Sequence, residues 1–321
     1  MRAEWHLQYT TARAQETNAS AVILNGMAIK IGIDLETEKV HLNPPDFELQ
    51  SKKLEKIWDE LNHHVRAEAV AAGSPDPIPE ETQRFLSNSQ GKIVEIKAHL
   101  LREKSPVWRE KIPAEPQFFS TLKGILRLHH LLAADALFQL NEGNPLQSET
   151  SLTACWKLNE SLRHRKEPIS VFVALKCSSI QMGLTKKLPS IPEVWETRFR
   201  ELDYRKALMV ALSAETTRFF DALNEKSVRR KFLTNELTLL PDWGKQPAAM
   251  LLDPYLRICR LNYLASEKEL ILALQNSRNP IDAPKREKHL LSDYLHEYES
   301  MNTRLLDFEK EQKRLQSGIY K

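Results

Sequence analysis

Apolar residues recur every three or four positions along most of the chain, which is the spacing of amphipathic α-helices. The clearest example is 168–187, where apolar side chains follow steps of four, four, three and four: Ile169, Val173, Cys177, Ile180 and Leu184. Such a stripe buries one face of a helix. The same periodicity predicts helices over 51–71, 80–103, 118–141, 147–166, 192–225, 254–276 and 286–317. The expected fold class is all-α, either an irregular helical bundle or a short array of helical hairpins.

One segment near the N-terminus has a different pattern. In AVILNGMAIKIGI, residues 21–33, Asn25 and Gly26 separate two short apolar runs rich in β-forming residues. Asn-Gly between such runs is a strong signal for the two-residue turn of a β-hairpin. We therefore expect a small β-hairpin at this place in the otherwise helical chain.

Proline-rich breaks suggest how the chain is divided. The segment KSPVWREKIPAEP, residues 104–116, holds three prolines and interrupts the helical periodicity. Because proline interrupts the hydrogen bonds of a helix interior, this segment is the best linker candidate. The expected division is a smaller α-rich segment over 1–115, which includes the hairpin, and a main helical domain over 116–321 that ends in a long helix.

The C-terminal helix over 286–317 has the most regular apolar spacing, interrupted only by the polar residue Gln312. Its seam consists of Leu291, Tyr294, Tyr298, Met301, Leu305, Phe308 and Leu315. Alternating steps of three and four over four heptads suit two arrangements. The helix can lie against the rest of the bundle, or it can join two copies of the chain in a homodimer through 286–317.

Composition excludes several classes of function. The chain has 9 glycines in 321 residues and neither of the glycine-rich phosphate motifs, so nucleotide-binding folds and cofactors are not expected. The net charge of +3, from 46 basic and 43 acidic residues, gives no reason to expect nucleic-acid binding. Three widely spaced cysteines argue against both a disulfide framework and a structural zinc site.

Membrane association is not encoded in the chain as given. It contains no uncharged apolar run of 18 residues, and the start MRAEWHLQYTTARAQE lacks the apolar centre of a secretory signal. The expected location is therefore cytoplasmic. A true start further upstream would change this expectation to an envelope-associated protein.

A resemblance covers residues 131–189. A helix of small residues ends at Gly143-Asn144, the phrase WKLNESLR follows at 156–163, and Glu167-Pro168 then opens a helix that begins with Ile169-Ser170. This order of features resembles a group of uncharacterised bacterial helical proteins. The resemblance implies a helical, envelope-associated protein to which no known activity, and so no catalytic residue, can be assigned.

The stretch LHHLLAADAL, residues 128–137, contains the most conspicuous candidate site residues: His129, His130 and Asp135. At about 100° per residue, Asp135 lies about 120° from His129 and about 140° from His130 around the helix. The three side chains therefore cannot form a metal site within this helix, and no metal is expected. Two interpretations remain: hydrogen-bonded polar groups in a helix buried on several sides, or residues of a ligand or catalytic site completed by other helices.

These observations favour a non-catalytic scaffold or interaction protein that binds a protein partner through its helical surface or its terminal seam. The alternative is a helical pocket protein that binds an apolar ligand, or an enzyme centred on 118–141 around His129, His130 and Asp135. An enclosed pocket that reaches these three side chains would favour the alternative, and an open concave face would favour the scaffold.

Overall fold

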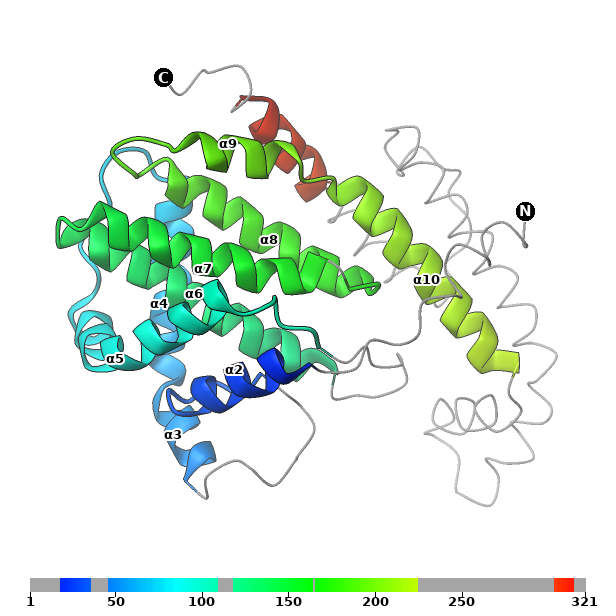
Figure 1. Cartoon of the computed structure of the whole chain (residues 1–321), viewed down its shortest axis with the longest axis horizontal. Helices are drawn as coiled ribbons and strands as arrows, with labels where there is room; N and C mark the ends of the chain where they lie inside the picture. Colours follow the sequence, from blue (N-terminus) through cyan, green and yellow to red (C-terminus); the bar gives the residue numbers. More distant parts are fainter. Residues whose placement is uncertain (1–17, 36–45, 109–117, 164, 225–302, 315–321) are drawn as a thin grey trace.

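The computed structural model of the chain describes residues 18–35, 46–108, 118–163, 165–224 and 303–314. All the regular secondary structure in these ranges is helical, which confirms the all-α prediction. The helices, shown in Figure 1, are α2 (Ala19–Ile29), α3 (Phe47–Lys53), α4 (Glu55–Val70), α5 (Glu80–Arg102), α6 (Phe118–Asn141), α7 (Pro145–Arg163), α8 (Pro168–Thr185), α9 (Glu193–Arg200) and α10 (Tyr204–Asn224). Residues 303–314 add a further helical segment.

Most of the predicted helices are present with nearly the expected bounds. The helix predicted over 118–141 is α6, and those predicted near 80–103 and 168–187 are α5 and α8. The α6 helix ends before Gly143, whose φ of 74° lies in the left-handed region that favours glycine at a helix C-terminus. Prolines open the next two helices at Pro145 and Pro168, where a missing N–H costs no hydrogen bond.

The segment that predicted a β-hairpin forms α2 instead. Asn18 caps this helix, because its side-chain oxygen accepts a hydrogen bond from the Ala21 N–H at 2.9 Å. Asn25 lies inside α2 and not in a turn, and its side chain accepts a hydrogen bond from the Leu35 N–H at 2.8 Å. Ala21, Leu24 and Ala28 lie in the core on one face of the helix, so tertiary packing outweighs the Asn-Gly turn signal.

The single helix predicted over 192–225 is two helices, α9 and α10. The helix is interrupted at 201–203. The Asp203 carboxylate accepts a hydrogen bond from the Lys206 N–H at 2.8 Å, which caps the start of α10. The apolar spacing continues across the break, with Phe199 and Leu208 both buried, so periodicity alone did not reveal it.

One core joins the described helices, with α6 at its centre. The α6 helix contacts α4, α5, α7 and α8, and its middle turns are buried on every side. This agrees with the expectation that 118–141 is a helix buried on several sides. Core residues of α2, α4 and α5 belong to the same cluster as those of α6 to α8, so the core continues across the predicted division at 115 and 116. The predicted boundary itself lies outside the described residues.

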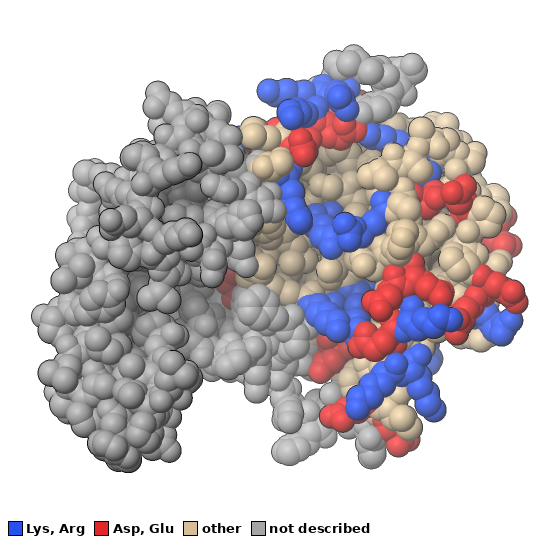
Figure 2. All heavy atoms as spheres, turned by 180° about the vertical axis from the view of Figure 1, so that it is seen from behind, with Lys and Arg blue, Asp and Glu red and all other residues tan. Residues whose placement is uncertain are grey.

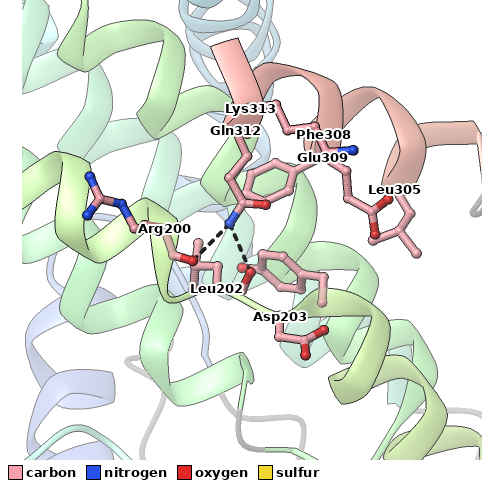
Figure 3. Close-up of a pocket in the computed structure, with 9 residues that line it drawn as sticks. Arg200, Leu202, Asp203, Leu305, Phe308, Glu309, Gln312 and Lys313 are labelled. Atoms are coloured by element: carbon pink, nitrogen blue, oxygen red, sulfur yellow. Dashed lines mark hydrogen bonds between the residues drawn. The ribbon is translucent and has the colours of Figure 1, made fainter. Parts of the chain in front are cut away.

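The segment 303–314 lies against α9 and the start of α10, and Figure 3 shows this contact. Its Phe308 ring meets the Tyr204 ring edge-on, with 5.3 Å between the ring centroids. Gln312, the polar interruption of the seam, donates from Nε2 to the carbonyl oxygens of Arg200 (3.2 Å) and Leu202 (3.1 Å), as Figure 3 shows, and also to that of Phe199 (2.7 Å) at the end of α9. A cavity of about 360 Å³ lies at this contact.

The described part of the seam is thus used within the chain. Leu305 and Phe308 are both buried in the core. The rest of the predicted helix over 286–317, and the predicted helix over 254–276, lie outside the described residues. The homodimer through 286–317 stays a prediction.

Candidate functional site

Asp135 of α6 is the centre of a buried polar network. Its carboxylate accepts hydrogen bonds from Lys97 Nζ of α5 at 2.7 Å, from Ser151 Oγ of α7 at 2.6 Å and from Gln90 Nε2 of α5 at 2.8 Å. Lys97 Nζ also lies 3.1 Å from Ser151 Oγ. We call Gln90, Lys97, Asp135 and Ser151 the buried network.

The buried network joins three helices, and Gln90 is its one partly exposed member. Asp135 and Ser151 are 0% exposed and Lys97 is 4% exposed. Ser151 is hydrogen-bonded to a lysine and a carboxylate, an arrangement that can activate a hydroxyl, but chemistry needs a substrate within reach of that hydroxyl. In this conformation the network acts as a structural connection between α5, α6 and α7.

His129 and His130 have a different environment from Asp135. Both are buried, and their rings meet edge-on with 6.1 Å between the centroids. Among the described residues, no hydrogen-bond partner is present for either ring nitrogen of His129 or for the Nε2 atom of His130. Burial lowers the pKa of His129 far below its usual range, and burial with the charges of Lys176 and Arg66 lowers that of His130 to about 3. Both rings are therefore neutral at pH 7.

The three candidate residues of the sequence are thus not brought together into one site. The side-chain partners of Asp135 are Gln90, Lys97, Gln139 and Ser151, and none of them is a histidine. Within the described ranges, no group of three His, Cys, Asp or Glu side chains is placed to hold a metal ion. Cys155 and Cys177 are buried thiols, and burial raises the pKa of Cys177 to about 12, so this thiol is protonated.

A larger feature lies on the surface, where α4 and α8 meet the segment 303–314. Residues of 66–73, 172–183, 186–191 and 304–314 line a groove of about 780 Å³. At one end a Cβ atom on Gly183 would collide with the Ala69 carbonyl oxygen, so the backbones of α4 and α8 touch there. We call this feature the basic groove.

The floor of the basic groove is apolar and its rim is polar. Leu175, Ile180, Met182 and Phe308 are buried groove residues. Arg66, Ser179 and Arg304 are exposed on the rim. Figure 2 shows Lys and Arg side chains beside a surface of uncharged residues on the face of the molecule opposite to that of Figure 1. A rim that reaches solvent around an apolar floor suits the binding of a partner group with one apolar side.

Six basic residues line the groove, and three of them are paired with carboxylates. Lys187 forms a buried ion pair with Glu68 at 2.8 Å. Lys186 and Arg314 both pair with Glu311. The remaining carboxylate of the groove, Asp307, pairs with Lys310 at 3.3 Å.

The other three basic residues are Arg66, Lys176 and Arg304, which we call the cation cluster. No carboxylate of the described residues forms an ion pair with any of the three. Burial lowers the pKa of the half-buried Lys176, and repulsion from Arg66 and Arg304 lowers it further. The cluster thus gathers three like charges beside an apolar surface.

Sequence reasoning missed the basic groove. The cation cluster comes from residues 66, 176 and 304, which are separated by more than a hundred positions each and form no local motif. Lys176 also lies in a helix whose apolar stripe suggested only packing. The one available signal was Gly183, a rare glycine inside a predicted helix, which marks the close approach of α4.

Comparisons of the chain with protein-family models, with curated proteins and with solved structures found no match. The resemblance of residues 131–189 to bacterial envelope-associated proteins therefore stays a prediction. No helix in the described part of the chain is long and apolar enough to cross a membrane.

Proposed function

We propose that the protein is a non-catalytic interaction protein whose basic groove receives a segment of a partner protein. The observation that carries this proposal is the cation cluster, three positive charges beside an apolar floor that form no ion pair with a carboxylate of the described residues. Like charges held together without counter-charges destabilise a fold, and proteins keep such arrangements at functional sites. A partner with an apolar side and an acidic side satisfies both parts of the groove.

The alternative, a pocket protein or an enzyme centred on α6, has less support. Neither of the two described cavities is lined by His129, His130 or Asp135. Asp135 already accepts three strong hydrogen bonds in the buried network, so it has little capacity left for a ligand. An interaction function needs none of these three residues to reach solvent.

Site-specific photo-crosslinking in native cells tests the proposal. A photoreactive residue in place of Ser179, which is exposed on α8 at the groove, should give a protein adduct of defined mass. The same residue in place of Val94, which is 52% exposed on α5, is the matched control and should not give that adduct. Phe172→Ala, which removes a half-buried groove side chain, should reduce the Ser179 adduct while circular dichroism stays unchanged.

Two results would contradict the proposal. Identical adducts from both positions would mean that contact with the groove is not specific. Native mass spectrometry that finds a bound small molecule, without any protein adduct from Ser179, would favour the pocket protein instead.

A further inference from the structure

We infer that Arg66, Lys176 and Arg304 form a binding site for a phosphoryl group carried by the partner segment. This inference rests on the proposed function and deepens it, because it gives the chemistry of the partner group that the groove recognises. The three side chains come from α4, α8 and the segment 303–314, so the site is completed only when the three elements pack together.

The charges around the groove point to an anion that comes from outside. Lys186, Lys187 and Arg314 already have carboxylate partners, and the two groove carboxylates, Asp307 and Glu311, already have basic partners. The cation cluster is what remains after this pairing among the described residues. Its net charge is therefore available for a ligand.

The number of cations favours a phosphoryl group over a carboxylate. A phosphorylated side chain brings a charge of about −1.5 to −2 and three acceptor oxygens, whereas a carboxylate brings one charge and two oxygens. Two guanidinium groups can each donate two parallel hydrogen bonds to such a group, and an ammonium adds a compact third charge. Three cations around one carboxylate would leave two charges uncompensated.

The position of Lys176 strengthens the site. This side chain is half-buried beside the apolar floor, while Arg66 and Arg304 are exposed on the rim. Burial and the two arginines lower the pKa of Lys176, so its charged form is disfavoured. A bound dianion would remove this penalty, and the low-dielectric surroundings would strengthen the attraction.

Thermal unfolding of the full chain with inorganic phosphate tests the inference. At a phosphate concentration about ten times the dissociation constant, the Tm should rise by roughly 2–4 °C above that in sodium chloride of equal ionic strength. Sodium acetate of equal ionic strength should give a smaller rise. Phenyl phosphate, which adds an apolar ring, should act at a lower concentration than inorganic phosphate.

Variants connect the response to the cluster. Lys176→Met should leave the Tm in chloride unchanged or raise it, because it removes a repelled charge beside the apolar floor, and it should abolish the response to phosphate. Arg304→Gln should weaken the response and serves as a second variant should Lys176→Met alter the fold. Lys53→Met, on α3 at the far end of the molecule from 303–314 in Figure 1, removes the same charge and should respond like the wild type.

Three outcomes would overturn the inference. One is equal stabilisation by phosphate, acetate and chloride, and another is a phosphate response that Lys176→Met retains. The third is co-sedimentation with vesicles of phosphatidylcholine and phosphatidic acid that is lost in Lys176→Met, which would assign the phosphoryl group to a lipid. A groove-dependent protein adduct without a phosphate response would overturn only this inference. A phosphate response without an adduct would overturn only the proposed function.

Discussion

Lys97 and Lys176 are both lysines taken partly or wholly out of water, yet their surroundings are opposite. Lys97 is 4% exposed, and its ammonium group lies 2.7 Å from the Asp135 carboxylate. Lys176 is half-buried, and burial together with repulsion from Arg66 and Arg304 lowers the pKa of its ammonium group. The first lysine has its counter-charge within the fold, whereas the second lies near two arginines and forms no ion pair with a carboxylate of the described residues.

The difference shows how structural and functional charges can be told apart. A buried charge is tolerated when a partner and hydrogen bonds compensate for lost hydration, and the buried network supplies both. A charge without compensation lowers the stability of the fold and needs another explanation. Binding of an external anion provides one for the cation cluster.

The largest expected effect comes from breaking the buried network. Asp135→Asn would leave the Lys97 ammonium group buried without a carboxylate, and the free energy of unfolding should fall by about 3–5 kcal/mol. Urea denaturation followed by circular dichroism measures this change. The double variant Asp135→Asn with Lys97→Met removes both charges and should recover most of the loss, and a double variant as unstable as the single one would contradict the ion-pair account.

A smaller effect, of opposite sign, is expected at His129. This ring is fully buried, and neither of its nitrogens has a hydrogen-bond partner among the described residues. His129→Leu replaces it with an apolar side chain of similar size and should raise the free energy of unfolding by about 1–3 kcal/mol. Urea denaturation at pH 7 measures the change. A loss of stability would contradict this expectation, because it would mean that the imidazole nitrogens of His129 make stabilising hydrogen bonds.

Over a single pH unit the smallest effect is a pH dependence at His130, which burial together with Lys176 and Arg66 keeps neutral. The pKa of His130 is about 3 in the folded protein and near 6.5 in the unfolded chain, so the unfolded chain binds the additional proton as the pH falls below 6.5. The neutral His130 ring therefore favours the folded state fully above pH 6.5, and this contribution to the free energy of unfolding is lost as the pH falls towards 3. Between pH 6 and 5 it amounts to about 1 kcal/mol.

Urea denaturation at several pH values checks this dependence. His130→Gln should remove the contribution, whereas His63→Gln, on the exposed side of α4, should retain it. Lys176→Met should raise the pKa of His130 and so narrow the pH range over which stability is lost. An unchanged slope in His130→Gln would mean that folding does not lower the pKa of His130.

The sequence predicted the helices better than the sites. Apolar periodicity located α4 to α8 because each buries one or more faces in a common core, and Gly143 and Pro168 mark their ends. The turn signal of Asn25-Gly26 was misleading at residues 21–33, because burial of α2 outweighs the turn preference. Apolar periodicity missed the interruption at 201–203, where a capping aspartate divides an otherwise continuous stripe.

The candidate site shows the limit of such reasoning more clearly. The angular positions around α6 correctly separated Asp135 from the two histidines, and they predicted a buried polar group in need of hydrogen-bond partners. They did not identify Lys97 or Ser151, because hydrogen-bond partners on other helices leave no trace in local spacing. The cation cluster was not predictable for the same reason, since its three residues come together only in the folded chain.

The most direct test of the account compares Lys97→Met with Lys176→Met, two identical changes at lysines that differ in their counter-charges. The free energy of unfolding is measured by urea denaturation at pH 7 in chloride buffer of low ionic strength. We predict that Lys97→Met lowers it by about 3–5 kcal/mol, because a buried carboxylate is left unpaired, and that Lys176→Met leaves it unchanged or raises it. An equal loss in both variants would contradict the account, because Lys176 would then also stabilise the fold.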